Sequence, residues 1–518
     1  MAITISVWKT RRQRSAASAW GMMAATLILP QRAGAADLAF VPTLRLSESY
    51  SDNIRLAPPQ LAMSELVSEF APGITVTSNT ARLKMNLAYS IQKLVYQKDP
   101  DTLNHQLQGN AKSVLLDDWL FADANASIRK QNVSAFGPQL IDNTQLSGNQ
   151  STVKGLSFSP YLLHDVRGLA TAELRYTYQD VRSGGSAGLS ARSDDLRFKL
   201  TGDKAGKGLI WDLYVDRNKI DDSFLAPVTA TSGALTLRYP LASSLSVFGT
   251  AGYERNDYAT SDASQPAGRL WSIGAAWNPS RRTSFSASGG KRFFGNTYSL
   301  DASHRSHNTV WNLTYSEDIT TTYAQFLALT PNDTSALLNQ LWLFSIPDPV
   351  ARQQAINLFI QIAPFFGVNA GAINYLSHQY FLDKRLNLSM ALSGPRTTLV
   401  LNLAHLQHTA QSTSSLDNSL LGAAQQALED RSRQSSASAG WSWRLSGRSS
   451  LNLSASYDRV NSLVTQRRDQ NAQFVAGLTQ QLQARVNATV QLHHVNHSSN
   501  AGGSYRENGI NAALNFQF

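Results

Sequence analysis

The chain ends in GINAALNFQF, residues 509 to 518, and this stretch decides the fold. Taken in steps of two, its apolar residues end on Leu514, Phe516 and Phe518, while polar or small residues lie between them. Alternation with a period of two is the pattern of a β-strand whose two faces have different surroundings. Because chain ends are usually polar and frayed, an aromatic last residue indicates a strand that runs to the end. These residues alone fit either the edge of a soluble sandwich or the closing strand of a barrel.

The same alternation recurs along the chain and favours the barrel. In LATAELRYTYQD, residues 169 to 180, Leu174 and Tyr176 share one face, whereas Arg175 and Thr177 share the other. Sandwich strands are commonly five or six residues long, whereas a tilted strand needs about ten residues to cross a bilayer, as these segments have. Only a closed barrel leaves no unpaired backbone in hydrocarbon, so the strands are expected to close on themselves.

The connections between the segments set the predicted number of strands. Short turns alternate with longer polar connections such as residues 133 to 150, and in bacterial barrels the short turns face the periplasm. The stretch TYSLDASHRSHNTVWNLTYSED, residues 297 to 318, is too long for one crossing, so its polar centre predicts a hairpin. The sequence therefore predicts an all-β fold: a transmembrane antiparallel β-barrel of about 22 strands, within limits of about 18 to 24, with both chain ends in the periplasm.

The N-terminal residues predict export. Lys9 and three arginines precede an apolar run, and the small residues at 33 to 35 offer a cleavage site, so residues 1 to 35 are a predicted signal peptide and residues 36 to 518 the barrel. The absence of cysteine excludes disulfide scaffolds, lipid-anchored lipoproteins and c-type haem carriers. We expect the first strand to begin close to the cleavage site, which leaves no room for the plug domain of a TonB-dependent transporter.

One segment, residues 319 to 376, interrupts the strand pattern. It is predicted to form two short helices, the second with Asp348 as N-cap and Pro349 at the first helical position. Strand parity places this insertion outside the cell, and its large apolar residues require burial. Packing on the barrel rim, an inward constriction of the lumen and a surface that docks a partner are all open. The candidate constriction residues are Trp342, Phe344 and Phe359.

Four stretches resemble a known family. PTLRLSESYSDNIRLAPP, SELVSEFAPGITV, KRFFGNTYSLDASHRSHNTVWNLTYSED and IPDPVARQQAI are similar to outer-membrane β-barrel proteins associated with the PEP-CTERM/exosortase system. The resemblance runs over nearly the whole mature chain and implies a role beside the production and export of extracellular polysaccharide. It supplies no functional residues to carry over.

No constellation of residues indicates catalysis. The ten histidines and many serines permit numerous serine–histidine–acid combinations, and none stands out. His493, His494 and His497 are close in sequence, but the first two point to opposite faces of a strand and no carboxylate lies among them, which argues against a metal site. No glycine-rich phosphate loop follows a strand and opens a helix. We expect no enzyme activity, no cofactor, no metal and no nucleic-acid partner.

Charged residues on the polar faces indicate the wall of the lumen. The candidate basic residues of the lumen are Arg45, Lys84, Arg175, Arg197 and Lys199. Acidic residues oppose them at Glu173, Asp212, Asp216 and Asp458. The chain has a net charge of +10, and a net positive channel would favour an anionic solute or an acidic polysaccharide. The alternative is a wall of mixed charge that only keeps the lumen wet.

These features predict a porin-like β-barrel in the outer membrane of a Gram-negative bacterium, closed by the terminal strand that carries Leu514, Phe516 and Phe518. The expected function is that of a conduit or accessory factor in exopolysaccharide export linked to a PEP-CTERM/exosortase system. The alternatives are a non-conducting structural or assembly barrel that binds a surface polymer or partner, and a general diffusion porin. The expected partners are outer-membrane lipids, the outer-membrane insertion machinery, and polysaccharide or export-system proteins.

Overall fold

The computed structural model describes the barrel wall and part of its connections. The described residues are 38–166, 168–184, 190–202, 208–222, 226–258, 260, 266–321, 323–324, 338–339, 379–412, 427–428 and 430–518. The predicted signal peptide, residues 1 to 35, lies outside them, and so do the candidate constriction residues Trp342, Phe344 and Phe359.

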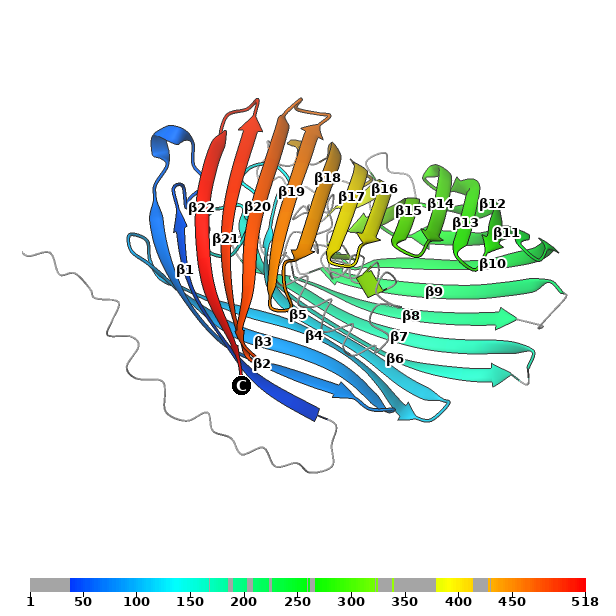
Figure 1. The fold of residues 1–518 in the computed structure, drawn as a ribbon. Coiled ribbons are helices and arrows are strands. Elements are labelled where there is room, and N and C mark those ends of the chain that lie inside the picture. The colour runs from blue at the N-terminus through cyan, green and yellow to red at the C-terminus, as the bar shows by residue number, and fades with distance from the viewer. Residues whose placement is uncertain are drawn as a thin grey trace, which may run out of the picture. The chain divides into compact units, whose positions relative to one another are not determined.

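Twenty-two antiparallel strands form one sheet. Each strand pairs with its neighbours in chain order, and the first strand also pairs with the last, which closes the barrel (Figure 1). The strands are β1 (Leu38–Ser51), β2 (Glu65–Asn79), β3 (Leu83–Tyr96), β4 (Thr102–Leu116), β5 (Leu120–Asn132), β6 (Gln150–Val166), β7 (Ala170–Ser183), β8 (Ser190–Gly202), β9 (Ile210–Asp222), β10 (Val228–Ala242), β11 (Leu245–Asn256), β12 (Ala267–Ser280), β13 (Thr283–Arg292), β14 (Gly295–Arg305), β15 (Thr309–Thr321), β16 (Tyr380–Ser393), β17 (Thr397–Ala410), β18 (Arg431–Arg444), β19 (Ser449–Ser462), β20 (Arg468–Gln483), β21 (Val486–Ser499) and β22 (Tyr505–Gln517). The predictions of an all-β closed barrel and of 22 strands are confirmed.

The interruption predicted for residues 319 to 376 begins later than the sequence indicated. β15 continues to Thr321, so Ile319 is still part of the barrel wall. Of the two predicted helices, only Leu338 and Asn339 of the first are among the described residues, where they are helical, and the insertion stays a prediction. Within the described ranges the one complete helical element is the short 3-10 turn η2 (Pro59–Leu61), and no helix there has the length and apolar character needed to cross a membrane.

The last strand closes the barrel over almost its whole length. Leu46 of β1 lies opposite Leu514 of β22, and Leu44 lies opposite Phe516. Beyond the last strand residue, the backbone N–H of Phe518 still donates to the carbonyl of Pro42 at 3.0 Å. The backbone ladder therefore reaches the final residue, which explains why the strand pattern runs to the chain end.

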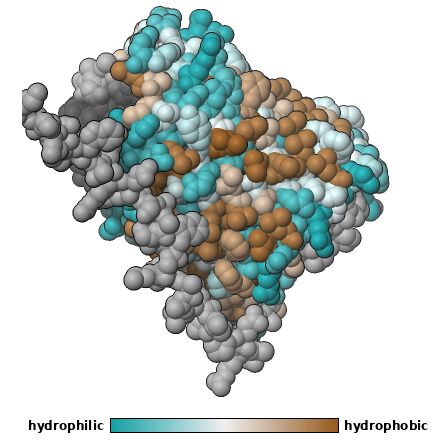
Figure 2. All heavy atoms as spheres, turned by 60° about the vertical axis from the view of Figure 1, so that its left-hand side comes forward, coloured by the Kyte–Doolittle hydropathy of each residue, from teal (hydrophilic) through white to brown (hydrophobic). Residues whose placement is uncertain are grey.

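The two faces of the wall differ as the alternation predicted. On β7, Leu174 is 41% exposed on the outward face, whereas the neighbouring Thr177 is 8% exposed on the inward face. On β19, Leu453 is exposed and Asn452 is buried. Figure 2 shows hydrophobic residues gathered across the middle of the visible face, with hydrophilic residues above them. An exposed apolar belt of this kind is the surface that a transmembrane barrel presents to lipid.

Connections at the two ends of the strands differ in length. The end that carries the start of β1 and the last residue of β22 has short turns, including the predicted hairpin, since β14 ends at Arg305 and β15 begins at Thr309. The backbone N–H of Ser306 donates to the carbonyl of Thr309 at 2.8 Å and tightens that turn. The opposite end carries the longer connections, although β13 and β14 are joined there by only Phe293 and Phe294. We call the two ends the turn rim and the loop rim.

Candidate functional site: a loop held inside the loop rim

A long connection folds into the barrel instead of extending away from it. Residues 133 to 149 join β5 to β6, and we call them the inner loop. Their partners include Asp469 on β20 and Glu507 on β22, both buried on the inward face of the wall. Those strands lie on the far side of β1 from β5 and β6 in the order of the sheet. The inner loop therefore spans part of the lumen at the loop rim.

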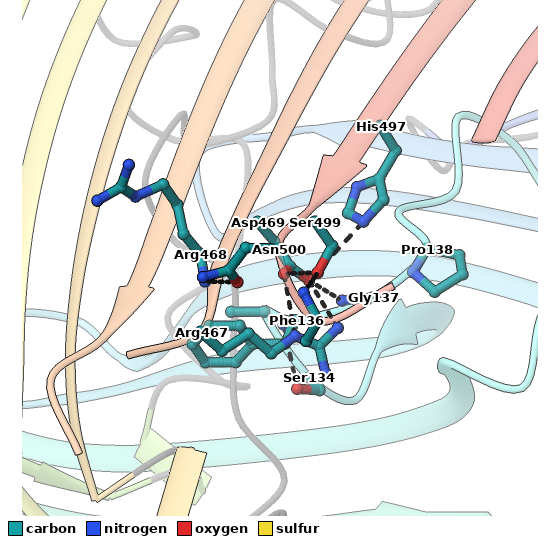
Figure 3. Close-up of polar contacts among 12 residues, drawn as sticks. Ser134, Phe136, Gly137, Pro138, Arg467, Arg468, Asp469, His497, Ser499 and Asn500 are labelled. Carbon is teal, nitrogen blue, oxygen red and sulfur yellow. Dashed lines mark hydrogen bonds and ion pairs between the residues drawn. The ribbon is translucent and has the colours of Figure 1, made fainter. Parts of the chain in front are cut away.

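The first anchor of the inner loop is the carboxylate of Asp469. The backbone N–H of Gly137 donates to Asp469 Oδ2 at 2.8 Å, and the Arg467 guanidinium binds both carboxylate oxygens, at 2.9 and 2.8 Å. Ser499 Oγ donates to Oδ1 at 2.6 Å. Figure 3 shows these groups converging from β20, β21 and the loop. A carboxylate that is 3% exposed is satisfied here by four charged or polar donors, which favours its ionised form in place.

An apolar contact reinforces this anchor. The Phe136 ring is 4% exposed and packs with Leu428 and Val460. The Arg467 guanidinium carbon lies 5.5 Å from the centre of the same ring. Arg467 thus contacts the loop ring and the wall carboxylate together, and the two interactions position one another.

The second anchor is Glu507 on β22. The Gln145 side-chain amide of the inner loop donates to one carboxylate oxygen, and Ser51 Oγ donates to the other at 2.6 Å. His493 Nε2 lies 3.3 Å from the oxygen that Ser51 contacts. Nearby, the backbone N–H of Gln139 donates to the Tyr505 hydroxyl at 3.2 Å. Glu507 has no exposed surface, so protein groups of the loop and the wall take the place of water around its carboxylate.

The third anchor joins the inner loop to the first three strands. The Tyr96 hydroxyl donates to the carbonyl of Thr144 at 2.9 Å, and the backbone N–H of Leu146 donates to the carbonyl of Ile54 at 2.8 Å. The Leu146 side chain packs on a buried cluster that includes Ile54, Leu94 and Tyr96. The third anchor is therefore largely apolar and places the loop beside the β1–β2 connection.

The β1–β2 connection is itself tied to the β3–β4 connection. The Arg55 guanidinium forms an ion pair with Asp99, which is 9% exposed. The hydrogen bond and negative charge of Asp99 raise the pKa of Arg55 above its ordinary value. The platform under the third anchor is thus held by an ion pair between two connections.

The sequence of the inner loop gives it a fixed shape. The Asn149 side-chain amide donates to the carbonyls of Ser134 and Pro138, both at 2.9 Å, and so draws the loop's first residues toward its last residue. The Asp142 carboxylate accepts from the backbone N–H of Thr144 at 2.8 Å, a side-chain turn typical of aspartate. Gly137 has φ +95°, a conformation that glycine adopts without steric cost.

Three of the predicted lumen cations lie in ion pairs on the inward face. Arg45 approaches Glu69 at 3.4 Å, and Arg175 contacts Glu173 at 2.8 Å and Asp123 at 3.0 Å. Arg197 contacts Asp216 at 3.0 Å and Asp195 at 3.8 Å. The positive charge of these positions is largely balanced within the wall.

The other two predicted cations have different neighbours in the wall. Lys84 lies opposite Lys112 in the register of β3 and β4, and Lys199 lies opposite Glu173 in the register of β7 and β8. Among the described residues, the anchors of the inner loop include none of the five predicted cations. The β7–β9 part of the wall is therefore one of mixed charge.

The interior faces of β18, β19 and β20 form a contrasting wall of mainly uncharged polar side chains. Ser436 lies in register with Asp458, which lies in register with Asn471. Several buried polar atoms here have no hydrogen-bond partner in the part of the chain that the structure describes: Gln434 Nε2 and Oε1, Ser436 Oγ, Asn452 Nδ2, Asn471 Oδ1 and Thr479 Oγ1. Buried polar atoms are normally satisfied, so this neutral wall requires water or the polar groups of a ligand.

The histidine run does not gather into one site. His493 faces inward to Glu507, whereas His494 faces outward and its Nδ1 lies 2.7 Å from Asn508 Oδ1. His497 faces inward, with Nε2 at 3.7 Å from Asp469 Oδ2. Over the described ranges, no group of three histidine, cysteine or acidic side chains is placed to hold a metal ion.

Sequence reasoning recognised the inner loop only as a long polar connection. The candidate constriction that it named, Trp342, Phe344 and Phe359, lies outside the described residues. The missed signal is the apolar content of the inner loop, where Phe136, Leu140 and Ile141 interrupt a polar stretch. Large apolar residues in a water-exposed loop require burial, and the barrel interior can provide it.

Comparisons with known proteins support the fold. No family model matches the chain, and no curated protein sequence matches it. Among solved structures, the chain is similar to the FrpB iron transporter from Neisseria meningitidis (F5-1 variant, apoprotein form), with 10% identity, 92% of this chain and 81% of that chain covered, and a TM-score of 0.50. It is also similar to the siderophore receptor PirA from Pseudomonas aeruginosa, with 9% identity, 92% and 80% coverage and a TM-score of 0.46. Identity this low shows a shared barrel fold alone.

Proposed function

We propose that the protein is an outer-membrane β-barrel that acts as a conduit, or as an accessory factor of a conduit, in exopolysaccharide export linked to a PEP-CTERM/exosortase system. The observation that carries the conduit is the inner loop, which lies across the loop rim on three separate anchors. A polar lumen with a structured segment at its mouth suits regulated passage better than free diffusion.

The outer surface supports the membrane location. Large apolar side chains such as Leu174, Leu453 and Phe474 are exposed on the outward face. Such a belt is unfavourable in water and favourable in a bilayer, and closure of the sheet removes unpaired strand edges. Export to the outer membrane further requires a signal, which the sequence predicts in residues 1 to 35.

Single-channel recording in planar bilayers tests the conduit. The full chain is expected to give small or infrequent conductance steps, because the inner loop obstructs the mouth. Replacing residues 135 to 147 with a short Gly/Ser linker should raise the conductance severalfold. The matched control is the same treatment of residues 501 to 503, a loop-rim connection that is exposed to solvent. Equal conductance of the two variants would count against the inner loop as the obstruction.

The link to polysaccharide rests on the family resemblance and needs a separate test. Deletion of the gene should lower secreted polysaccharide while leaving its synthesis inside the cell intact. Complementation with the full chain should restore secretion. Unchanged secretion in the deletion strain would contradict the role in polysaccharide export. It would not contradict the barrel fold.

A non-conducting structural barrel is the second candidate. It is favoured by the density of the anchors, since Asp469 and Glu507 are both fully satisfied with the loop in place. A correctly folded barrel that gives no conductance steps in planar bilayers, even with the inner loop replaced, would support this second function.

The solved structures bear on transport only by analogy. FrpB is described as an iron transporter and PirA as a siderophore receptor, and those activities belong to those proteins. A general diffusion porin is the least supported alternative, since the inner loop narrows the mouth.

A further inference from the structure

Three arginines gather on the outward face of the barrel near the loop rim. Arg433 of β18, Asn461 of β19 and Arg468 of β20 lie opposite one another in one row of the sheet. The Nε atoms of Arg459 and Arg468 both donate to Asn461 Oδ1, at 3.4 and 3.2 Å. Figure 3 shows the Arg468 side chain directed away from Asp469. We call Arg433, Arg459 and Arg468 the outer arginines.

The outer arginines have no negative charge beside them. The acidic residues of strands β17 to β22 are Asp458, Asp469 and Glu507. Asp469 and Glu507 are buried on the inward face, and Asp458 shares that face because it lies in register with the buried Ser436. In the part of the chain that the structure describes, no carboxylate pairs with an outer arginine. Two guanidiniums thus converge on a neutral amide, and their mutual repulsion favours an anion beside them.

Cations at the same end of β7, β8 and β9 are neutralised instead. Arg182 and Arg192 both pair with Asp180, at 2.8 and 3.2 Å. Lys219 pairs with Asp221 at 3.0 Å. The unbalanced charge is therefore a property of β18 to β20 and not of the loop rim in general.

An apolar groove lies on the same strands, nearer the turn rim. Its volume is about 470 Å³, and small side chains form part of its lining, since Ala439 lies opposite Ala455 in the register of β18 and β19. Trp441, Leu453 and Leu492 add larger apolar side chains. Leu453 and Leu492 are exposed on the outward face. The groove therefore opens toward lipid.

The spacing between the groove and the outer arginines matches the depth of one membrane leaflet. On β19 the outward face runs from Ala455 in the groove, through Tyr457, to Arg459. At 3.3 Å per residue, Ala455 and Arg459 are about 13 Å apart along the strand. Half of the hydrocarbon thickness of a bilayer is about 15 Å. Tyr457 is 44% exposed between them, where an aromatic girdle is expected. The outer arginines thus lie at headgroup level above a groove at acyl-chain level.

We propose that the outward face of β18 to β20 binds one lipid of the outer leaflet whose headgroup carries a phosphate monoester. The phosphate contacts the outer arginines, and an acyl chain lies in the groove. The long connections of bacterial barrels face outside, which puts the outer arginines in the outer leaflet. A phosphate monoester carries a charge of about −1.5 to −2 at pH 7, and arginine forks bind its oxygens bidentately. The acyl chain supplies the apolar contact that a free anion lacks. This site lies on the opposite face of the wall from the lumen, so it is separate from the conduit function.

A second copy of the chain is the competing occupant of the groove. Oligomers of one chain are usually symmetric, and a twofold contact through this face would pair the same patch with itself. Both sets of outer arginines would then lie at the same height in the membrane and close to one another. Their repulsion disfavours this contact, whereas a phosphorylated lipid satisfies the arginines and the groove together.

Lipid binding to the purified full chain tests the proposal. Native mass spectrometry from an uncharged detergent counts the lipid molecules bound to each chain. The probes are lipid A, which carries phosphate monoesters, the same lipid with its phosphates removed, and phosphatidylglycerol, whose phosphate is a diester. We expect one lipid A per barrel, bound at least about tenfold more tightly than either of the others. Equal affinity for the dephosphorylated lipid or for phosphatidylglycerol would overturn the proposal.

Removal of the outer arginines should weaken lipid A binding about tenfold. The variant is Arg433→Gln with Arg459→Gln and Arg468→Gln. Its matched control removes three cations from the other side of the same rim: Arg182→Gln, Arg192→Gln and Lys219→Gln. The control should change the affinity less than about twofold, because those cations are already paired. Equal losses in both variants would show an effect of net charge only and would contradict a site on β18 to β20.

Filling the groove tests the acyl-chain half of the site. Ala439→Leu with Ala455→Leu keeps the outward face apolar and should weaken lipid A binding about fivefold. The control, Ala251→Leu with Ala275→Leu, adds the same side chains to the outward face of β11 and β12, beside the exposed Trp271, and should have no effect. Heat-modifiable gel mobility verifies that the variants fold, and the comparison of the three lipids on the unaltered chain needs no variant.

Two further outcomes would assign the site to another occupant. Millimolar inorganic phosphate should fail to displace lipid A from the unaltered chain, and displacement would show a free-anion site and overturn the proposal. A dimer in the mass spectrum that dissociates when the groove is filled would assign the groove to a second copy and would overturn it as well.

Discussion

At the scale of single residues, buried carboxylates decide where the inner loop lies. Asp469 and Glu507 are almost wholly buried on the wall, and each accepts hydrogen bonds from the loop. A buried carboxylate without partners is costly, so the loop stabilises the wall as much as the wall positions the loop. Polar anchoring also gives the loop one defined position, which apolar contacts alone specify less sharply.

Loss of the Asp469 carboxylate should release one end of the inner loop. Asp469→Ala leaves Arg467 without its partner and removes the acceptor of the Gly137 N–H, a loss of about 3 kcal/mol of anchoring. Limited proteolysis should then cleave near Gly137 at least about tenfold faster, while the barrel keeps its heat-modifiable mobility. Asp180→Ala, which removes ion pairs with Arg182 and Arg192 on β7 and β8, is the control and should leave the cleavage unchanged.

The two faces of a strand should respond differently to charge. Leu174→Lys or Leu453→Lys places a cation on the lipid face and should lower the free energy of unfolding by about 2–4 kcal/mol near mid-bilayer. Ser454→Lys, on the inward face of β19, should cost much less. Thr177 is a poorer control than its polarity suggested, because it is buried and accepts from Ser159 Oγ at 3.1 Å. Urea unfolding in lipid vesicles gives the comparison, and equal losses on both faces would show a wrong register.

At the scale of elements, β22 both continues the sheet and closes it. It pairs with β21 in chain order and with β1 across the closure. Its final residues add aromatic surface, with the rings of Phe516 and Phe518 stacked at a centroid distance of 6.5 Å. The element is therefore both a wall strand and the seal of the barrel.

Substitution of the last residue should impair assembly more than stability. Phe518→Ser removes the terminal aromatic ring while leaving the backbone donor to Pro42. We expect less protein in the outer membrane, because aromatic residues at the membrane interface anchor the closing strand. Phe474→Ser, which removes an exposed ring from the outward face of β20, is the matched control. Membrane fractionation measures the level, and a normal level for Phe518→Ser would refute the special role of the terminus.

At the scale of the whole molecule, closure is what makes the other features possible. Every strand has a partner on both sides, so the sheet closes around a lumen. Its polar face lines that lumen and its apolar face points outward. Because the wall closes, a loop that leaves it at β5 can contact β20 and β22 across the interior. The same closure brings the mixed-charge wall of β7 to β9 and the neutral wall of β18 to β20 into one lumen.

A designed disulfide tests the closure. Ser47 and Ala513 are register partners of β1 and β22, and both are buried on the inward face. Because the chain has no cysteine, Ser47→Cys with Ala513→Cys gives a single possible cross-link. Mild oxidation should join the two strands almost completely, as seen by a mobility shift on non-reducing denaturing gels. Ser47→Cys with Gly509→Cys, which is out of register, is the control, and equal cross-linking of both pairs would contradict the closed register.

Much of the fold was predictable because it depends on local periodicity. The alternation at Leu174 and Thr177 requires a wall between apolar and polar surroundings, and the polar centre before Thr309 requires a turn. The positions of Arg45 and Arg175 on the inward face follow from the same alternation. Their ion pairs with Glu69 and Asp123 could not be predicted, because those partners lie on other strands and the sequence does not give the register between strands.

The sequence by itself determined the strands, their faces, their number and the end at which the chain closes, since a period of two and the length of a bilayer crossing are properties of each segment alone. Only the tertiary structure decided that residues 133 to 149 fold inward onto Asp469 and Glu507, and that buried polar side chains without partners gather on the inward faces of β18 to β20. Those contacts join residues more than three hundred positions apart, and no local pattern records them. The physical reason is that such pairings arise only when the barrel closes and brings distant strands around one lumen.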